Sequence, residues 1–95
     1  MLPIARFRIS GHSMEPSIKN GQKVLVSSIP YFFSKPKCSD IVAFRKIEKV
    51  FVKRIIKISE GKYFLKGDNE KDSFDSREFG WIERENFIGK LIFKF

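Results

Sequence analysis

The serine at position 13 is the first residue whose type and surroundings could do chemistry. It lies in the segment GHSMEPSIKNG, between His12 and Met14. A serine hydroxyl is a poor nucleophile unless a base removes its proton. His12 is a weak candidate for that base, because adjacent residues of an extended segment point to opposite sides and no nearby carboxylate is spaced to orient the ring as in a Ser-His-Asp triad. Ser13 is therefore either a nucleophile that takes its base from elsewhere or a turn residue before a strand.

A stronger candidate for the base is Lys53, in the alternating segment KVFVKRIIKI at 49–58. Side chains of a strand alternate between its two faces, so Lys53 shares a face with Phe51 and Ile55. A lysine with its ordinary pKa of about 10.4 stays protonated at neutral pH, but desolvation disfavours the ammonium form and lowers that pKa. Lys53 is either a buried lysine that can act as a base or a strand lysine whose amine reaches solvent.

The third segment of interest is GDNEKDSFDSREFG at 67–80, which is more polar than a simple hairpin requires. Asp75 and Arg77 lie two residues apart and can pair, which would fix the loop. Ser73 or Ser76 can exchange a hydrogen bond with a neighbouring lysine amine. The segment is either a polar surface turn or the support of a catalytic site.

We expect no metal site and no cofactor. The oxygen-bearing side chains of the polar segment do not follow the EF-hand spacing, and no glutamate stands at the closing position. These side chains are Asp68, Asn69, Asp72 and Asp75. The only cysteine, Cys38, excludes an internal disulfide or a cysteine-based metal cluster, and we expect it to be a small buried hydrophobic residue.

Strands are expected to position these residues, because apolar alternation and β-branched or aromatic residues recur between turn signals. The expected strands are Phe7–Ser10, Lys23–Ser28, Asp40–Arg45, Lys49–Ile58, Tyr63–Lys66 and Phe87–Phe95. No segment shows a sustained helical period, apart from a possible single turn after Pro16. The prediction is an all-β fold, mostly antiparallel, with one core and one domain over residues 1–95.

Composition restricts the partners and the location of the chain. Its 19 basic and 11 acidic residues give a net charge of +8, which favours anionic partners such as lipid headgroups or nucleic acid. No apolar run approaches the roughly 18 residues of a membrane-spanning helix, and Met1–Phe7 is too short for a secretory signal. We expect a soluble protein or one attached peripherally to a membrane surface.

The loop IPYFFSKPK at 29–37 holds three adjacent aromatic residues between two prolines, where a long regular strand is not expected. Either at least one of Tyr31, Phe32 and Phe33 fills the core, or the three form an exposed apolar tip. Such a tip would enter a membrane interface, with Lys35 and Lys37 beside it for anionic headgroups.

Taken together, these segments resemble the type I signal peptidase family. SMEP at 13–16 resembles the family's serine box, DIVAF at 40–44 its next box and FVKRII at 51–56 its lysine box. The match is most specific at 67–77, where GDN, three residues and SFDSR reproduce the family's GDN-xxx-S-x-DSR. The order of the boxes also agrees with the family.

The resemblance implies a serine endopeptidase on a small, coiled or barrel-like antiparallel β-fold of the kind shared with SOS-response repressors. Ser13 would be the nucleophile and Lys53 the general base, and the backbone N–H of Ser13 would donate to the oxyanion. Ser73 would hold the lysine amine, and Asp75 with Arg77 would brace the loop. Met14 and Gly11 would line the substrate site. The substrate would be a precursor polypeptide, bound as an extended strand and cut after small residues.

Several features depart from the family pattern. Some members place a serine two residues before the nucleophile, where this chain has Gly11, so that only backbone donors remain for the oxyanion. Ser39 stands where the family's box usually begins with glycine. Only ten residues precede Gly11, so we expect no membrane anchor before the serine box and, as the resemblance implies, either peripheral attachment to the bacterial cytoplasmic membrane or a soluble cytoplasmic location. The connection from Lys53 to Gly67 is short. This trimmed form is similar to the maturation peptidases of nickel superoxide dismutase, which remove a leader from one partner protein.

Three other interpretations fit parts of the sequence. A self-cleaving SOS-repressor domain also pairs serine with lysine, but this chain lacks a helix-turn-helix segment. The Ser-x-x-Lys spacings at 34–37 and 59–62 match the motif of penicillin-binding proteins, but Pro36 and Gly61 argue against the helix it requires. A non-catalytic basic β-domain that binds membranes or RNA remains the alternative from another functional class.

Overall fold

The computed structural model describes residues 3–71 and 74–95, and these residues form one antiparallel sheet of seven strands with little helix. The strands are β1 (Ile4–Arg8), β2 (Lys23–Ser27), β3 (Ile41–Lys46), β4 (Lys49–Ser59), β5 (Lys62–Lys66), β6 (Ile82–Glu83) and β7 (Phe87–Lys94). Their order in the sheet is β1-β2-β7-β3-β4-β5-β6, and every neighbouring pair is antiparallel. The predicted all-β fold is confirmed.

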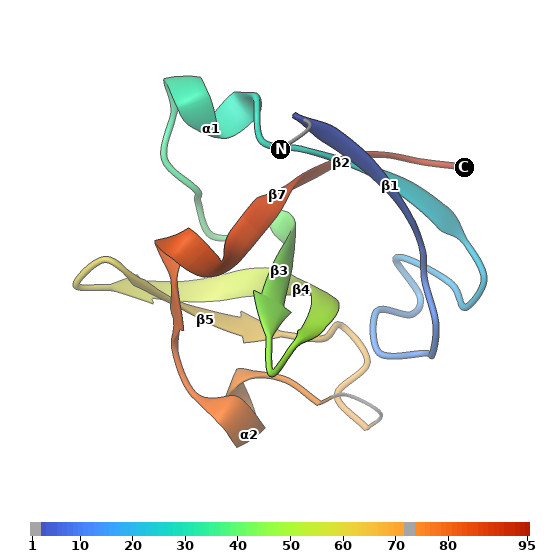
Figure 1. Cartoon of the computed structure of the whole chain (residues 1–95). Coiled ribbons are helices and arrows are strands. Elements are labelled where there is room, and N and C mark those ends of the chain that lie inside the picture. The colour runs from blue at the N-terminus through green and yellow to red at the C-terminus, as the bar shows by residue number, and fades with distance from the viewer. Residues whose placement is uncertain (1–2, 72–73) are drawn as a thin grey trace.

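The sheet is strongly coiled, so that β1 and β2 run across the direction of β4 and β5 (Figure 1). Because side chains alternate along each strand, β3 contributes to two separate core clusters. Val42 and Phe44 pack into one cluster, whereas Ala43 packs into the other. The first cluster also contains Ile55, Tyr63, Leu65, Ile82 and Phe87, and the second contains Met14, Ile18, Val24, Val26 and Val52. Strand β3 is therefore buried on both faces and anchors the sheet.

Helical structure is limited to single turns. Pro30 opens α1 (Pro30–Phe33), where its fixed φ suits the first helical position. Asp75 caps α2 (Ser76–Phe79) in a capping box with Glu78. The 3-10 segment η1 (Arg84–Asn86) leads into β7. The segment after Pro16 is a turn in which the Ile18 N–H donates to the Met14 carbonyl, not an assigned helix.

One expectation about the core was wrong: Cys38 is exposed. It lies two residues after Pro36 in the loop that connects α1 to β3, and Pro36 is the buried residue of this loop. The next residue, Ser39, has a φ of 81° in the left-handed region. The loop therefore turns sharply after Pro36 and leaves the thiol on the surface.

Candidate active site

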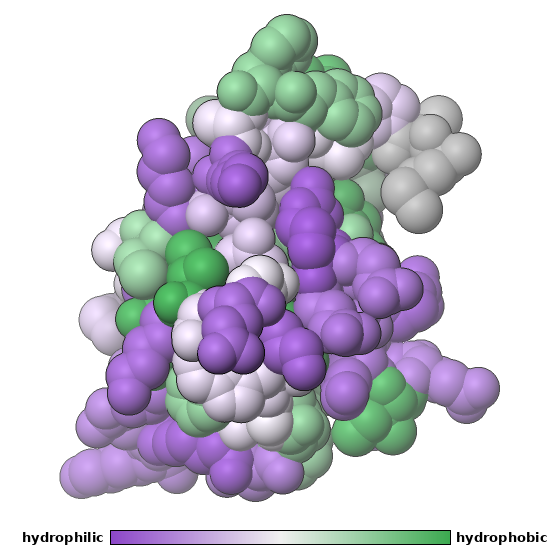
Figure 2. All heavy atoms as spheres, turned by 90° about the vertical axis from the view of Figure 1, so that its left-hand side faces the viewer, coloured by the Kyte–Doolittle hydropathy of each residue, from purple (hydrophilic) through white to green (hydrophobic). Residues whose placement is uncertain are grey.

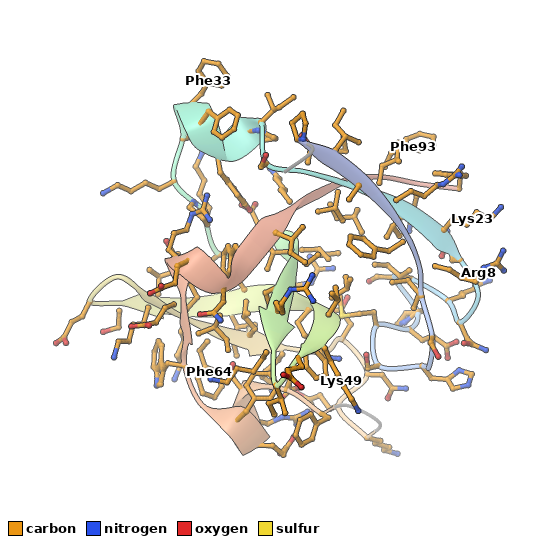
Figure 3. All side chains as sticks on the ribbon, viewed as in Figure 1. Arg8, Lys23, Phe33, Lys49, Phe64 and Phe93 are labelled. Atoms are coloured by element: carbon orange, nitrogen blue, oxygen red, sulfur yellow. The ribbon has the colours of Figure 1, made fainter. Side chains whose placement is uncertain are left out.

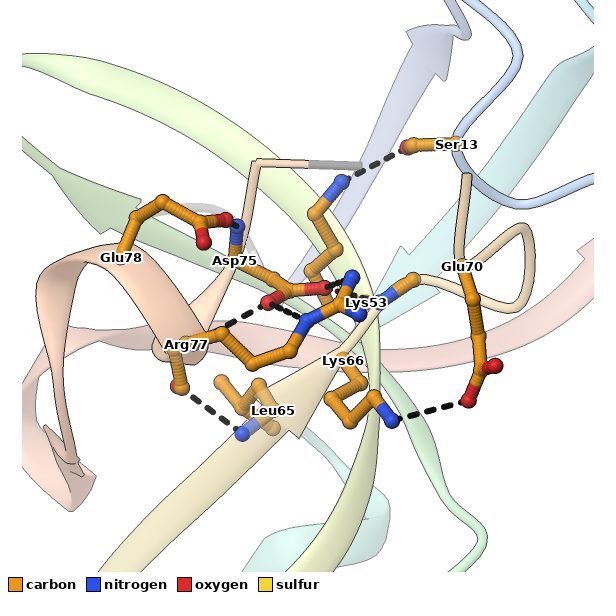
Figure 4. A network of polar contacts seen from close by, with 10 residues as sticks. Ser13, Lys53, Leu65, Lys66, Glu70, Asp75, Arg77 and Glu78 are labelled. Carbon is orange, nitrogen blue, oxygen red and sulfur yellow. Dashed lines mark hydrogen bonds and ion pairs between the residues drawn. The ribbon is translucent and has the colours of Figure 1, made fainter. Parts of the chain in front are cut away.

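The fold brings Ser13 and Lys53 together from segments 40 residues apart. Lys53 Nζ lies 2.6 Å from Ser13 Oγ, and the lysine is only 4% exposed. Lys53 is paired with Val42 of β3, and its apolar neighbours on the same face of β4 are Phe51 and Ile55. The lysine amine lies 5.9 Å from the centre of the Phe51 ring. Figure 4 shows the amine reaching from β4 to the turn that carries Ser13.

Core packing and hydrogen bonds from Asn69 fix the turn that carries Ser13. Met14 and Ile18 are each 1% exposed and belong to the second core cluster. The Asn69 backbone N–H donates to the Ser13 carbonyl at 2.8 Å, and its side-chain amide donates to the His12 carbonyl at 3.1 Å. Asn69 therefore holds the backbone on both sides of the His12–Ser13 peptide bond.

A second polar bridge joins the serine turn, the lysine strand and the 67–69 segment. Arg54, which follows Lys53 on β4, donates two hydrogen bonds of 2.9 Å to the Asp68 carboxylate. Asp68 also accepts a 2.6 Å hydrogen bond from the Ser17 hydroxyl. The bond from Arg54 is the largest cause that holds the pKa of the Asp68 carboxyl below its usual value. Asp68 therefore stays ionised and fixes β4 against the serine turn.

Asp75 and Arg77 pair as predicted. The Arg77 guanidinium donates two 2.9 Å hydrogen bonds to the fully buried Asp75 carboxylate, which also accepts from the backbone N–H of Gly67 (Figure 4). Ser76 instead supports β5, because its hydroxyl accepts from the Leu65 N–H at 3.0 Å. Ser73, the other serine predicted to contact the lysine, lies outside the described residues, as does Asp72.

His12 forms an exposed pair with Glu15, whose carboxylate lies 2.9 Å from the imidazole Nδ1. The expectation that no nearby carboxylate is spaced to orient this ring was wrong, because the turn brings Glu15, three residues later, onto Nδ1. The hydrogen bond with His12 is the largest cause that lowers the pKa of the Glu15 carboxyl. The imidazole is 54% exposed, and thus far more hydrated than the buried Lys53 amine.

A pocket of about 260 Å³ opens beside the serine and the lysine. It lies between β1 with its extension and the first half of β4, and Met14 lines it next to Ser13. In the described residues β1 pairs only with β2, and β4 pairs with β5 only from Arg54 onward. The strand edges at the two sides of the pocket are thus available to a further extended chain. The pocket lining comprises Phe7, Arg8, Ile9, Ser10, Ser13, Met14, Val50, Phe51, Val52 and Lys53.

Gly11 lies at the start of the serine turn rather than in the lining of this pocket. Its φ of 100° is in the left-handed region, which glycine adopts without strain. Its N–H donates to the side-chain oxygen of Asn20 at 2.8 Å. The glycine therefore shapes the entry to the turn, and its role in lining the substrate site stays a prediction.

Other features of the described residues concern metals and membranes. No cluster of three or more potential ligands that could hold a metal ion occurs within 3–71 and 74–95. In the same ranges no helix has both the length and the apolar character to cross a membrane.

Sequence reasoning missed the positioning roles of Asn69, Arg54 and Ser17. The sequence indicated Asp68 and Asn69 as possible metal ligands and as part of the GDN motif, but it did not predict their contacts with the serine turn. Their presence in the GDN motif was the one sequence feature that pointed to a role at the site. Ser17 carried no signal of its own, because only the fold brings it to a residue 51 positions away.

Comparison with known proteins identifies the family. The model of the family described as "Signal peptidase, peptidase S26" matches residues 1–58 and 57–95, the full length of the chain. The two segments meet in β4, close to the β4–β5 hairpin, which agrees with the short connection noted in the sequence.

Three curated relatives illustrate the similarity. Thylakoidal processing peptidase 1 of Arabidopsis thaliana is 26% identical over 137 aligned positions, which cover 92% of this chain and 40% of that protein. Probable signal peptidase I-1 of Synechocystis sp. is 23% identical, with 92% and 68% covered. Signal peptidase I V of Bacillus subtilis is 26% identical, with 90% and 82% covered. This chain thus spans about two fifths of the thylakoidal protein and larger shares of the two signal peptidases. Because the family model matches along its whole length, the chain belongs to the signal peptidase S26 family.

Proposed function

We propose that this chain is a single catalytic domain and a serine endopeptidase that removes a signal or leader peptide through a Ser13–Lys53 dyad. The observation that carries the proposal is the 2.6 Å distance between Ser13 Oγ and the amine of Lys53, a lysine that is almost fully buried. Burial disfavours the ammonium form, which is the condition a lysine needs to accept a proton. Membership of a peptidase family supports the same reaction.

In this mechanism the neutral Lys53 amine accepts the proton of the Ser13 hydroxyl while Oγ attacks the scissile carbonyl carbon. The tetrahedral intermediate collapses to an acyl-enzyme, and Lys53 returns the proton to the leaving amine. Lys53 then takes a proton from water, which attacks the ester carbonyl and releases the shortened peptide. The lysine is thus regenerated as the neutral base when the serine recovers its proton.

The backbone N–H of Ser13 is the proposed oxyanion donor. No acceptor in the described part of the chain holds this N–H, so it is available to substrate. Gly11 supplies no hydroxyl at the position where some family members have one. The oxyanion would therefore depend on backbone donors, which cost no side-chain reorganisation when charge develops.

The pocket indicates how substrate would bind. An extended peptide can lie between the open edge of β1 and the open edge of β4, with backbone hydrogen bonds on both sides. Alternate side chains of such a peptide point into the pocket. Its volume of about 260 Å³ must also hold the reacting peptide bond, so it suits small residues before the cut.

The loop from Gly67 to Gly80 would hold Ser13 and Lys53 in position relative to each other. Asp75 and Arg77 brace the loop by their paired hydrogen bonds, and Asn69 fixes the serine turn. The family resemblance assigns Ser73 to the lysine amine, and this role is part of the proposal. None of these residues reacts with substrate; they position the two that do.

The substrate is proposed as a class, a precursor polypeptide that carries a removable N-terminal segment. The resemblance to maturation peptidases nominates one specific alternative, the precursor of a nickel superoxide dismutase. Incubation of the chain with that precursor and with generic signal-peptide substrates separates the two. Cleavage of the precursor alone supports a dedicated processing peptidase, and cleavage of both supports a general one.

The test of the reaction class is detection of the acyl-enzyme. Wild-type chain is incubated with peptides that carry small residues before the cut, quenched in acid and analysed by intact mass. The expected result is an adduct whose added mass is that of the N-terminal fragment less one water, on a peptide that contains Ser13. Ser13→Ala should form no adduct, whereas the control Ser59→Ala, at the exposed end of β4, should form it.

Hydrolysis by Ser13→Ala at the wild-type rate would contradict the proposal. A folded wild-type chain that cleaves none of the peptides and binds RNA or vesicles with steep salt dependence would instead support a non-catalytic basic domain.

A further inference from the structure

Helix α1 ends in an apolar projection that the proposed peptidase reaction does not use. Phe33 is 86% exposed and Phe32 is 69% exposed, and Ile29 precedes them with 40% exposed. We call these three residues the apolar tip. Figure 2 shows a hydrophobic cap at one end of the molecule, and Figure 3 shows Phe33 pointing outward from α1 at that end.

The apolar tip is held in place by the residues beneath it. Tyr31 packs against the first core cluster, and its hydroxyl donates to Asp40 at 2.7 Å. Asp40 also accepts from the Lys37 N–H at 3.1 Å, so both ends of the loop are fixed to one carboxylate. The Arg84 guanidinium lies 5.3 Å from the centre of the Tyr31 ring. Tyr31 packs inward, as the first interpretation of these aromatics predicted, while Phe32 and Phe33 face solvent, so two of the three rings are exposed.

The surroundings of the apolar tip are basic. Lys35 and Lys37 follow it, both are exposed, and the segment 29–39 contains no carboxylate. A hollow of about 610 Å³ adjoins the tip, and Lys35 and Arg84 line it together with aromatic side chains. The whole chain carries a charge of +8. An apolar projection beside cations matches the interface of a bilayer with anionic headgroups, where rings enter the acyl boundary and ammonium groups meet phosphates.

Other occupants fit less well. A second copy would also carry +8, so the two copies would repel each other. Two phenylalanines and an isoleucine form a small contact compared with the roughly 1,200–2,000 Å² of a stable protein interface. Single-stranded RNA is bound by grooves or sheet surfaces along which successive bases stack, whereas the two exposed rings stand at the end of a four-residue helix.

We propose that the apolar tip docks this chain on an anionic lipid surface, with Phe32 and Phe33 inserted at the headgroup boundary and Lys35 and Lys37 on lipid phosphates. The proposal is independent of the peptidase activity, because it uses no residue of the Ser13–Lys53 site. Tyr31 and Asp40 act as the structural base that presents the two rings.

The first experiment is co-sedimentation with vesicles of phosphatidylcholine mixed with phosphatidylglycerol, and with vesicles of phosphatidylcholine alone. Wild-type chain should bind the mixed vesicles and bind the neutral ones weakly. The double variant Phe32→Ser with Phe33→Ser should lose at least about tenfold in binding. Lys35→Gln with Lys37→Gln should lose about tenfold on the anionic vesicles only.

The matched control is Phe93→Ser with Phe95→Ser. These phenylalanines are also exposed, 57% and 50%, and stack on each other near the C-terminal end of β7. This control should bind like wild type. Circular dichroism and thermal unfolding confirm that both double variants are folded. The proposal would be overturned if only the control lost binding to vesicles, or if all forms bound vesicles equally. It would also be overturned if Phe32 and Phe33 were needed for binding to RNA but not to vesicles.

A second measurement tests whether the aromatic ring at position 33 enters the lipid. Trp81 is the only tryptophan, so Trp81→Phe with Phe33→Trp places a single fluorophore on the apolar tip. Its emission should shift to the blue with anionic vesicles and be quenched by lipids brominated near the start of the acyl chain. Unchanged emission under conditions where the protein sediments with vesicles would contradict insertion of the tip.

Discussion

The contact between Lys53 and Ser13 has the geometry of proton transfer, and its surroundings determine whether the transfer can occur. The lysine amine is buried beside Phe51, whereas the imidazole next to Ser13 in sequence is exposed and lies against Glu15. His12 is adjacent to Ser13 in the sequence but is hydrated. The sheet instead places Lys53 against the serine turn, which is why Lys53 is the proposed base.

Asn69 is predicted to position the nucleophile without touching substrate. Asn69→Ala removes the side-chain bond to the His12 carbonyl but keeps the backbone bond to the Ser13 carbonyl. The serine should therefore sample positions farther from Lys53, and kcat should fall about ten- to a hundredfold with a smaller change in KM. Steady-state kinetics on a cleaved peptide measure both constants.

The matched control is Asn86→Ala, because Asn86 also donates its side-chain amide to a backbone carbonyl, that of Arg45, at an exposed site. It should leave kcat unchanged. Equal losses in both variants would mean that Asn69 acts through general stability.

Asp68 should contribute stability that depends on pH. Its folded-state pKa is held below the usual value, first by the bond from Arg54, so the unfolded state binds a proton more readily. The contribution is therefore present above the unfolded pKa and is lost as pH falls below about 4. Asp68→Asn should lower the free energy of unfolding by roughly 1–3 kcal/mol at neutral pH, because it removes a charged partner of Arg54 and Ser17.

Denaturant unfolding of wild type and Asp68→Asn at several pH values measures this difference, which should shrink toward acid. Glu70→Gln is the control. Its partner Lys66 is at a similar distance, but Glu70 is largely exposed, so no measurable change is expected. A difference that stays constant with pH would show that Asp68 acts by shape or packing rather than by charge.

At the scale of elements, local patterns predicted six strands because each has alternation and is bounded by turn residues. β6 was not predicted, since only two residues form it and its pairing with Lys62 and Tyr63 of β5 defines it. The start of the first strand was placed three residues late, because Ile4–Arg8 becomes a strand through its register with β2. Long-range pairing, which a single sequence does not display, accounts for both differences.

Helix α2 is different, because its signal was present in the sequence. Asp75 and Glu78 have the spacing of a capping box, which marks a helix start. The sequence analysis predicted the pairing of Asp75 with Arg77 but not its role as a helix cap. The same buried carboxylate makes the ion pair and the cap, so one residue fixes the loop and starts the helix.

The turn before β3 offers a test of backbone strain. Ser39 stands where the family's box usually has glycine, and its φ of 81° lies in a region that costs a non-glycine residue roughly 1 kcal/mol. Ser39→Gly should therefore raise the free energy of unfolding by about that amount. The backbone contacts of this residue, from its N–H to Ile55 and from Arg54 to its carbonyl, do not depend on its side chain.

Denaturant unfolding compares Ser39→Gly with Ser59→Gly, a control at the end of β4, where glycine should destabilise the strand. A loss of stability in both variants would show that the serine side chain supports the turn.

For the whole molecule, the alternation predicted the fold class, and the motifs predicted that Ser13 and Lys53 would meet. The sequence did not predict which residues hold the serine turn against β4, since Ser17, Arg54 and Asn69 meet only when the sheet coils. It also left the aromatic loop with two interpretations, and the fold separated Tyr31 from its two neighbours. The two residues of the proposed dyad are thus recognisable from their motifs, whereas the contacts that hold them depend on the three-dimensional arrangement.

The whole molecule also separates two proposed activities. The Ser13–Lys53 site uses β4 and the turn between β1 and β2, and the apolar tip is carried by α1. Substitution of Phe32 and Phe33 should therefore leave cleavage of a short soluble peptide unchanged, although it weakens binding to vesicles.

The central claim is tested most directly by cleavage of a peptide library with small residues at the first and third positions before the cut. The rate is measured across pH for wild type, Ser13→Ala and Lys53→Ala. We predict that wild-type kcat/KM rises with pH as the lysine amine loses its proton, and that both variants lose activity by about a thousandfold or more while remaining folded. Cleavage that survives both substitutions would contradict the dyad.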